Sequence, residues 1–329
     1  MISQIEKNSI NLYQLKAKKD VIYVEQFFFS FLKKNFFQNI KNNRKYLKKN
    51  IKCICGSKKI VNRKKIGLFN YSKCKCGNIY ISPMITNKGL DLIYSDKGPY
   101  SLYRKKFVKK KKSNQIRTSL VNKRKFEQLN LILNKKNSII LDYGCGDGAF
   151  LEACYKGGYT NLYGIDSNLK DAKKKFKIKF HQNIEEIKSV KFDCVTMWGV
   201  LEHLNDPINF LLKIRKKLKN NGKILFEVPN SESLLMNYIF KSKKNDVKRF
   251  LEPGRHLYFF SLNYLKKYIK RIGFQLEDFE TNGLDIQSIL GPSKSKNELN
   301  KILKIQKYLD NQNLSDHLRV VIKKKNNFN

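Results

Sequence analysis

Long apolar runs are missing from this chain, so no segment of the sequence is expected to cross a membrane as a helix. The most apolar stretch near the start, Val21 to Leu32, contains Glu25 and Gln26 and is too short to span a bilayer. No signal peptide is visible either. Together with the cysteine usage described below, these absences predict a cytoplasmic protein.

Acidic residues are also scarce, because 27 Asp and Glu stand against 68 Lys and Arg, giving a net charge of +41. Such an excess is typical of proteins that bind a polyanion. Only ten of the basic residues are arginine, however, whereas nucleic-acid readers favour its planar guanidinium. Lys, Asn and Ile are all abundant and share A/T-rich codons, so biased base composition is the preferred explanation. Nucleic acid is therefore not the expected partner.

Cysteine occurs in an odd number, seven, which does not suit a disulfide framework. Four of the seven form two close pairs, Cys53-x-Cys55 and Cys74-x-Cys76, each followed by glycine. Pairs of thiolates on two turns are typical of a zinc ribbon, although the usual turn has two residues between its cysteines. The alternative is a ribbon-shaped segment without metal. Residues 51–85 are thus predicted to be a zinc-ribbon-like unit.

The rest of the chain divides into three further parts. Residues 1–50 are predicted to be a helical extension whose Phe-rich stripe packs on the protein itself or on a second subunit, or else contacts a membrane surface. Residues 86–136 are predicted to be a basic helical linker. Residues 137–329 alternate strands and helices, which predicts an α/β domain with a parallel sheet. Its strands are expected at 138–142, 161–165, 177–181, 192–197, 222–228, 274–280 and 317–323, with helices after the first two strands and at 207–219, 261–271 and 293–313.

The clearest chemical signal begins where the first of these strands ends. The chain there reads Leu-Asp-Tyr-Gly-Cys-Gly-Asp-Gly, in which Gly144, Gly146 and Gly148 alternate. Glycine allows a tight turn and a close approach of backbone to ligand. A dinucleotide fingerprint has a different spacing, and Asp142 stands where it would repel a phosphate. An acid beside the loop suits a ligand with a cationic ammonium and sulfonium, such as S-adenosylmethionine.

A second acid follows the next strand. Asp166 lies 24 residues beyond Asp142, at a strand end where a carboxylate can accept hydrogen bonds from both ribose hydroxyls of an adenosine. Ser167, next in the chain, is a further candidate contact, with capping of the following helix as the alternative. Asn183 and Ile184, after the third strand, are placed near the adenine by position alone.

These motifs resemble those of class I S-adenosylmethionine-dependent methyltransferases. The resemblance implies a Rossmann-like fold with a seven-stranded, mostly parallel sheet whose last strand is antiparallel. It also implies that Met197 and Trp198, at the end of the fourth strand, line the cofactor cleft, with Glu202 and His203 in the loop beside it. For Trp198 the alternative is a place in the apolar core.

Methyl transfer to a hydroxyl, a protonated amine or an acidic carbon needs a base. The chain has only four histidines. His256 lies between the fifth strand and the next helix, in a loop expected at the mouth of the active site, and is the first candidate. His203 is the second. The alternative role for His256 is to fix its loop through hydrogen bonds to backbone.

A narrower similarity concerns the whole arrangement. A cysteine ribbon, a linking helix, a class I core and a histidine five residues before a serine-led helix resemble ribbon-bearing sugar methyltransferases of bacterial polysaccharide and antibiotic pathways. The C-methylating branch has tyrosine and glutamate where this chain has Pro253 and Arg255. The departure favours O- or N-methylation of a sugar, a nucleotide-sugar or another small metabolite, and Arg255 could instead grip an anionic substrate.

Two other functions remain open at this point. One is methylation of RNA or DNA, which the absence of an Asp/Asn-Pro-Pro-Tyr-type tetrapeptide after the fourth strand disfavours. The other is a scaffold that binds the cofactor or a partner without catalysis. Nothing in the sequence defines the oligomeric state.

Overall fold

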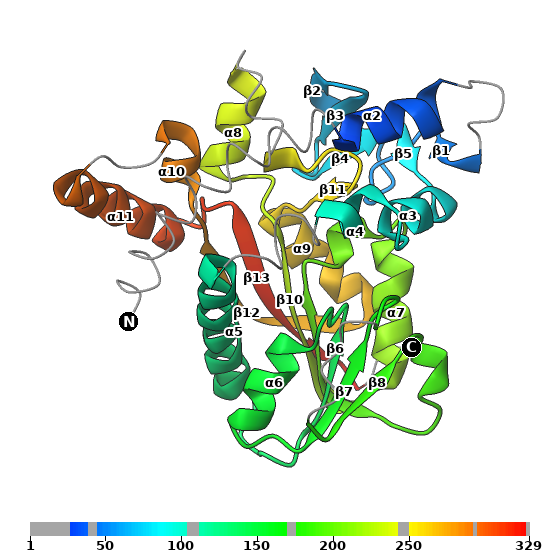
Figure 1. Ribbon diagram of the computed structural model, residues 1–329, viewed down its shortest axis with the longest axis vertical. Coiled ribbons are helices and arrows are strands. Elements are labelled where there is room, and N and C mark those ends of the chain that lie inside the picture. The colour runs from blue at the N-terminus through cyan, green and yellow to red at the C-terminus, as the bar shows by residue number, and fades with distance from the viewer. Residues whose placement is uncertain are drawn as a thin grey trace.

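A seven-stranded sheet forms the centre of the computed structural model, which describes residues 27–38, 45–103, 112–169, 176–242, 250–291 and 295–326 (Figure 1). For residues 112–120 it describes the helical backbone alone. The strands of the central sheet are β6 (Ile139–Tyr143), β7 (Asn161–Ile165), β8 (Ile178–His181), β9 (Phe192–Trp198), β10 (Leu218–Pro229), β12 (Phe274–Asn282) and β13 (His317–Lys324).

The order of these strands is β12-β13-β10-β9-β6-β7-β8. β6 pairs in parallel with β7 and β9, whereas β13 runs antiparallel to both of its neighbours. The predicted mostly parallel sheet with a reversed last strand is confirmed. β10 begins at Leu218 instead of 222, because Leu218 already pairs with Phe192 before the register shifts to Lys223 and Cys194.

Helices follow most of the strands. Asp206 accepts a hydrogen bond from the Asn209 N–H at 3.0 Å and Pro207 opens the next helix, so this helix begins at 207 as predicted. That helix ends at Lys217 instead of 219. The helix expected after the second strand lies outside the described residues. The helices of this part are α5 (Lys112–Ile132), α6 (Ala149–Lys156), α7 (Pro207–Lys217), α8 (Leu234–Lys241), α9 (Leu262–Tyr268), α10 (Asp285–Leu290) and α11 (Lys296–Asn311).

Side chains alternate between two apolar cores, one on each face of the sheet. Ile140 and Cys194 pack in the cluster that contains residues of α5 and α6. Their neighbours Leu141 and Val195 pack in the cluster that contains residues of α7 and α9. Because successive strand residues point to opposite faces, strands covered on both faces must be apolar throughout. This requirement explains why the strands were visible as apolar runs in the sequence.

A smaller antiparallel sheet contains the predicted ribbon segment. Its strands are β2 (Ile60–Ile66), β3 (Phe69–Cys74) and β4 (Ile79–Ser82), and a fourth strand, β11 (Tyr258–Phe259), pairs with β4. β11 comes from the loop that carries His256, far along the chain. The N–H of Ser261 also donates to Asn78 Oδ1 at 2.8 Å. The ribbon segment is therefore joined to the main sheet domain by shared strands and hydrogen bonds.

Residues 27–38 of the N-terminal extension are helical and pack on the protein itself, whereas Leu47–Lys48 form a strand, β1, that pairs with β5 (Met84–Ile85), so the helical prediction for 1–50 is wrong there. The helical turns include α2 (Phe29–Leu32) and a π-helical stretch from Lys33 to Phe37. Phe28, Leu32 and Phe36 are buried. A Cβ built on Gly254 would meet Leu32 at 2.9 Å, so this stripe lies against the loop that carries His256. Val24 and Ile40, which continue the helical spacing of the Phe-rich stripe in the sequence, lie outside the described residues.

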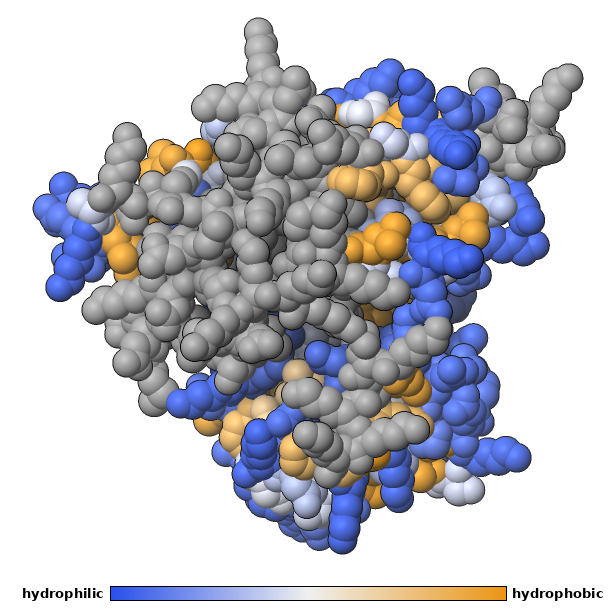
Figure 2. All heavy atoms as spheres, in the orientation of Figure 1, coloured by the Kyte–Doolittle hydropathy of each residue, from blue (hydrophilic) through white to orange (hydrophobic). Residues whose placement is uncertain are grey.

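Two short helices, α3 (Asn87–Tyr94) and α4 (Pro99–Tyr103), precede α5 in the segment predicted as a linker. Among the helices that the structure describes, none combines the length and the apolar character that a membrane span requires. Hydrophilic side chains are spread over several separate parts of the described surface in the view of Figure 2.

Candidate functional site

The glycine loop adopts a backbone that other residues tolerate poorly. Gly144, Gly146 and Gly148 have φ angles of 77°, 59° and 78°, all in the left-handed region. A Cβ on Gly144 would lie 2.7 Å from Val200 Cγ2, and one on Gly148 would lie 2.9 Å from the ring of Phe180. The loop thus needs glycine for its own conformation and packing as well as for the predicted approach of a ligand.

Asp166 lies directly across from this loop. Its Oδ2 accepts a hydrogen bond from the Gly146 N–H at 2.9 Å, and its Oδ1 accepts one from the Asn168 N–H at 2.9 Å. The carbonyl of Ile165 accepts bonds from Gly144 and Cys145 at 2.7 and 3.0 Å. The strand ends of β6 and β7 therefore hold the carboxylate and the bare backbone together, as the sequence predicted.

Asp142 lies deeper than the loop. It is 2% exposed, and its Oδ1 accepts a hydrogen bond from the Thr196 hydroxyl at 2.7 Å. Burial raises the pKa of Asp142 to about 7, and the hydrogen bond from Thr196 offsets only part of that rise. The carboxyl belongs to the buried support under the loop, and its contact with a cationic ligand stays a prediction.

The two predicted cleft residues of β9 have different surroundings. Met197 is fully buried in the apolar core, so in this conformation its side chain does not reach a cleft surface. Trp198 is half-buried; its ring meets Phe150 edge to face with centroids 5.3 Å apart, and Lys125 Nζ lies 4.6 Å from its centroid. Trp198 Nε1 is buried without a hydrogen-bond partner among the described residues.

The remaining predicted cofactor contacts lie around the same edge of the sheet. Ser167 is exposed next to Asp166. Asn183 is exposed and caps the short helical turn Ile184–Glu186, its N–H donating to Glu186 Oε1 at 3.1 Å. Ile184 is buried in the core. The contacts of Asn183 and Ile184 with an adenine, and of Ser167 with the cofactor, stay predictions.

The two predicted histidines lie side by side on the other flank of the sheet edge. The ring centroids of His203 and His256 are 5.0 Å apart. Both imidazoles face Glu202, whose Oε1 lies 3.8 Å from His203 Nε2 and 4.0 Å from His256 Nε2. The N–H of Leu257 donates to the carbonyl of Glu202 at 2.7 Å. This bond holds the two loops, and hence the three side chains, together.

The histidines are neutral at neutral pH. Burial, with repulsion from His256 and Arg255, holds the pKa of His203 well below its usual value. Burial lowers the pKa of His256 to about 4, and it raises the pKa of the Glu202 carboxyl to about 8. His203 Nδ1 lies 2.8 Å from the carbonyl oxygen of Arg255, which can only accept. Nδ1 therefore carries the proton, and Nε2 presents a lone pair toward Glu202.

Arg255 and Glu252 form the rim of this cluster. Arg255 Nη1 lies 2.6 Å from Glu252 Oε2, and the guanidinium lies 4.0 Å from the ring centroid of Tyr100. Tyr94, at the end of α3, is 5.9 Å from the same guanidinium. The α3–α4 segment is thereby held against the histidine loop. Because Glu252 already pairs with Arg255, an anionic substrate would have to compete with it for the guanidinium.

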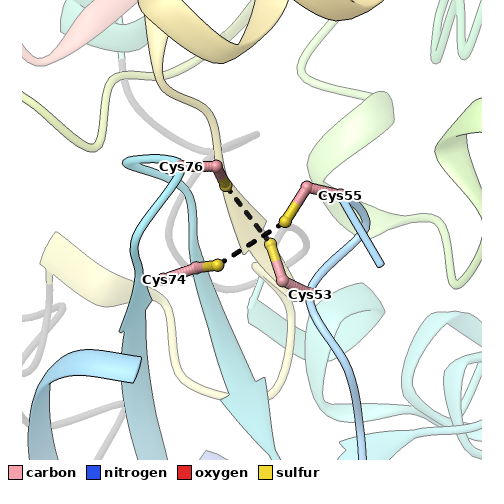
Figure 3. A group of neighbouring side chains, drawn as sticks. All are labelled: Cys53, Cys55, Cys74 and Cys76. Carbon is pink, nitrogen blue, oxygen red and sulfur yellow. Dashed lines mark hydrogen bonds between the residues drawn. The ribbon is translucent and has the colours of Figure 1, made fainter. Parts of the chain in front are cut away.

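The four cysteines of the ribbon converge on one point (Figure 3). Cys53 Sγ lies 3.6 Å from Cys76 Sγ, and Cys55 Sγ lies 3.5 Å from Cys74 Sγ. All four sulfurs lie within 4.8 Å of one another. A tetrahedral zinc ion with Zn–S bonds of about 2.3 Å separates its sulfurs by about 3.8 Å. The donor set and its size fit zinc in spite of the short spacing within each pair.

The backbone explains how one intervening residue suffices. In each pair the following glycine turns the chain, because Gly56 N–H donates to Cys53 O at 2.8 Å and Gly77 N–H donates to Cys74 O at 2.9 Å. The two glycines have φ angles of 82° and 96°. Hydrogen bonding from Cys53, the largest cause, lowers the pKa of Cys76 to about 6. One sulfur of the set is thus predisposed to be a thiolate, the form that binds metal.

Comparison with known proteins identifies the central part of the chain. Residues 117–278 match the family model described as "Methyltransferase domain". The matched stretch carries the glycine loop, Asp166 and both histidines on the sheet whose strand order is given above. This part of the chain, 162 of its 329 residues, is thus similar to methyltransferase domains.

Two curated relatives match only part of this chain and only part of their own length. An uncharacterized protein of Methanocaldococcus jannaschii is 39% identical over 137 residues, covering 39% of this chain and 57% of its own. The mitochondrial ubiquinone biosynthesis O-methyltransferase of Candida albicans is 32% identical over 155 residues, covering 43% of this chain and 45% of its own. The chain thus spans about half the length of these curated relatives.

A solved structure, the plantazolicin methyltransferase BpumL in complex with a monoazolic desmethylPZN analog and SAH, is 18% identical. The similarity covers 71% of this chain and 93% of that one, with a TM-score of 0.47.

Sequence reasoning missed part of the polar cluster in the methyltransferase domain. Glu202 was noted only as a neighbour of His203, and Glu252 and Tyr94 were not noted at all as site residues. No spacing in the sequence connects residue 202 with residue 256. The only signal in the sequence is a glutamate shortly before each histidine. Glu202 lies one residue before His203, and Glu252 lies four residues before His256.

Proposed function

We propose that this chain transfers the methyl group of S-adenosylmethionine to an oxygen or nitrogen of a small acceptor. The acceptor class that we propose is a sugar or nucleotide-sugar of surface polysaccharide biosynthesis. Support for the donor comes above all from one observation: the Asp166 carboxylate lies 2.9 Å from the Gly146 N–H, at neighbouring ends of parallel strands in a methyltransferase domain.

The residues of the chain would share the work between donor and acceptor sides. Bound S-adenosylmethionine supplies an electrophilic methyl group on a sulfonium. The bare backbone at Gly144, Gly146 and Gly148 admits the nucleoside part closely, and Asp166 accepts hydrogen bonds from its ribose hydroxyls. Holding donor and acceptor in line and excluding water can supply much of the acceleration.

His203 and His256 are the proposed catalytic residues on the acceptor side. Both are mostly buried, with side chains 16% and 15% exposed, and both are neutral at neutral pH for the reasons given above. Activation of a hydroxyl or amine requires such lone pairs. The choice of an O- or N-acceptor rests on Pro253 and Arg255, which replace the tyrosine and glutamate of C-methylating enzymes.

Calorimetry with S-adenosylhomocysteine tests the donor side. Asp166→Asn should weaken binding at least about tenfold, because it removes a charged acceptor of ribose hydrogen bonds. Asp193→Asn is the matched control: Asp193 accepts a hydrogen bond from the Ile139 N–H at 2.7 Å at the opposite end of the strands. Equal affinities in the two variants, or no binding to the unmodified chain, would contradict the proposal.

Methyl incorporation from labelled donor tests the acceptor class. Label on nucleotide-sugars supports the proposal. Label on RNA, with binding that weakens steeply as salt rises, supports the nucleic-acid alternative instead. Tight cofactor binding without any transfer supports the scaffold alternative.

We further propose that Cys53, Cys55, Cys74 and Cys76 bind a structural zinc ion. The support is the convergence of the four sulfurs at distances close to those of a tetrahedral thiolate site. Zinc would stabilise a small sheet that has little apolar core of its own.

A further inference from the structure

Three metal-ligating side chains converge on the acceptor side of the domain, apart from the cysteines. The carboxylate of Glu202 and the imidazoles of His203 and His256 place one donor atom each within 4.8 Å of the other two. Donors of one octahedral or tetrahedral ion with bonds of about 2.1 Å lie about 3.0 to 3.5 Å apart. The observed 3.8 and 4.0 Å from Glu202 Oε1 to the two Nε2 atoms need only a small contraction.

The carboxylate of Glu202 has an unmet electrostatic requirement. Glu202 is 4% exposed, and its Oε2 has no hydrogen-bond partner among the described residues. Ionising a buried carboxyl that has no compensating partner costs several kcal/mol, which a bound cation would offset. Arg255, in the loop of His256, is already paired with Glu252 at 2.6 Å.

The histidine on the same loop is oriented as metal-binding histidines are. His203 donates its Nδ1 proton to the Arg255 carbonyl at 2.8 Å, which leaves the Nε2 lone pair directed toward Glu202. A backbone carbonyl on the distal nitrogen is a common second partner of a ligating imidazole. The ligands come from two loops that the Leu257–Glu202 backbone bond holds in place.

We propose that Glu202, His203 and His256 bind one divalent first-row metal cation that also coordinates the acceptor hydroxyl. Two imidazoles and one carboxylate, with positions left for oxygen ligands, suit Mn²⁺, Fe²⁺, Co²⁺ or Zn²⁺. This inference rests on the proposed methyl transfer, for which it specifies how the two histidines act. The two histidines hold a metal cation that acts as a Lewis acid. The acceptor is then a substrate with a hydroxyl group that can coordinate this cation.

The chemical step balances without an oxidant. The coordinated hydroxyl loses its proton to solvent and keeps the electron pair on oxygen, which the cation stabilises. The oxygen then forms a bond to the methyl carbon while the carbon–sulfur bond breaks and its electrons return to sulfur. The products are a methyl ether and the neutral thioether S-adenosylhomocysteine.

Binding of Mn²⁺ to the full-length chain tests the proposal without an activity assay. Mn²⁺ is the probe because thiolates bind it poorly, and no free zinc is present, since zinc would compete with Mn²⁺ for the proposed site. The amount of free Mn²⁺ is read from its electron paramagnetic resonance signal. We expect one Mn²⁺ per chain, and we expect Glu202→Gln and His256→Gln each to weaken it at least about tenfold.

His181→Gln is the matched control, because His181 Nδ1 also lies near a carboxylate, 3.4 Å from Glu186 Oε2, but belongs to no three-donor group among the described residues. It should leave Mn²⁺ binding unchanged. No saturable binding, or equal binding in all four proteins, overturns the proposal. Circular dichroism shows whether each variant folds. Glu202→Gln and His256→Gln change two different loops, so a fold defect in one does not affect the test of the other. Calorimetry with S-adenosylhomocysteine on the same preparations shows whether the donor still binds, and so separates a failure of the metal site from a failure of the proposed function.

Discussion

At the scale of single residues, Asp166 and Asp142 show how two carboxylates near one loop are given different properties. Asp166 is half-buried and accepts two backbone hydrogen bonds, so it is held in place with room for a ligand. Asp142 is buried and accepts a hydrogen bond from the Thr196 hydroxyl, so a charge on it is poorly solvated. Environment, not residue type, gives these two carboxyl groups their different properties.

The titration of Asp142 should be visible in stability. Burial places its folded pKa at about 7, above the ordinary 3.8, so the native state holds an additional proton between these values. The contribution of this proton to the free energy of unfolding is fully present below pH 3.8 and is lost as pH rises through about 7. At about 1.4 kcal/mol per pKa unit, the whole loss is on the order of 4 kcal/mol. Asp142→Asn should remove this slope in urea unfolding measured across the same pH range.

The change of the unfolding free energy with pH, compared between variants, separates the titration of Asp142 from that of other groups. Absolute stabilities would not do so. Asp193→Asn changes an acid that is not buried in the core and should keep the slope of the unmodified chain. If Asp142→Asn loses stability with rising pH as steeply as the unmodified chain does, Asp142 is ionised in the native state throughout.

At the scale of elements, the sequence predicted the parts whose burial imposes a pattern. The inner strands β6 and β9 are buried over most of their length, so their apolar runs are legible, and a carboxylate at the end of β7 had to lie near the loop after β6. The two-residue strand β11 and the short helices α8 and α10 were not predicted. A strand of two residues has no periodicity, and its pairing depends on a partner strand far away in the chain.

The same limit applies to the site. Asp166 and the glycines follow from neighbouring strands, and the histidine pair was predicted only as two separate candidates. Contacts between Glu202, His203 and His256 depend on how two loops fold back, which local sequence does not encode. The convergence of the four cysteines was predicted, although the short spacing argued against it.

Helix α6 offers an element-scale test, because left-handed glycines lie at both of its ends. Gly148 and Gly158 have φ angles of 78° and 96°. A Cβ on Gly158 would meet Lys136 at an ordinary 3.8 Å, whereas one on Gly148 would lie 2.9 Å from the Phe180 ring. Gly158→Ala should cost about 1–2 kcal/mol of unfolding free energy from backbone strain. Gly148→Ala should cost about 1–3 kcal/mol more from overpacking.

Urea unfolding of both variants measures the difference, and calorimetry with S-adenosylhomocysteine measures the loop. Gly148→Ala should also weaken binding, since the distorted turn lies beside Gly146. Equal destabilisation by the two variants would show that the Phe180 ring moves aside without cost.

At the scale of the whole molecule, three N-terminal segments converge on residues 252–261. The helical turns of the extension pack against Gly254, the α3–α4 segment stacks Tyr100 on Arg255, and the ribbon sheet pairs with Tyr258–Phe259. The loop that carries His256 is thus held by these segments as well as by the end of β10, where the Phe260 N–H donates to the Pro229 carbonyl at 2.9 Å. Its position depends on parts of the chain that precede this loop by more than a hundred residues.

Removal of the proposed zinc should therefore affect the distant loop. Chelation should loosen the turns at Cys53 and Cys74, and with them β4 and its partner β11. Hydrogen–deuterium exchange should rise in peptides covering 252–261 and stay unchanged in those covering 161–165, which form β7 of the central sheet. Restoring zinc should reverse the change. Exchange that is the same with and without chelator would show that the ribbon holds its shape without metal.

The pairing of β11 with β4 has a consequence for how this protein can vary. A ribbon exchanged for that of another enzyme would meet a foreign edge at Tyr258 and Phe259 and misalign the segment that leads to His256. Chimaeras should succeed only when residues 51–85 and 252–261 are transplanted as a pair. Natural recombination is subject to the same coupling, so the two stretches form one inherited unit although the chain separates them.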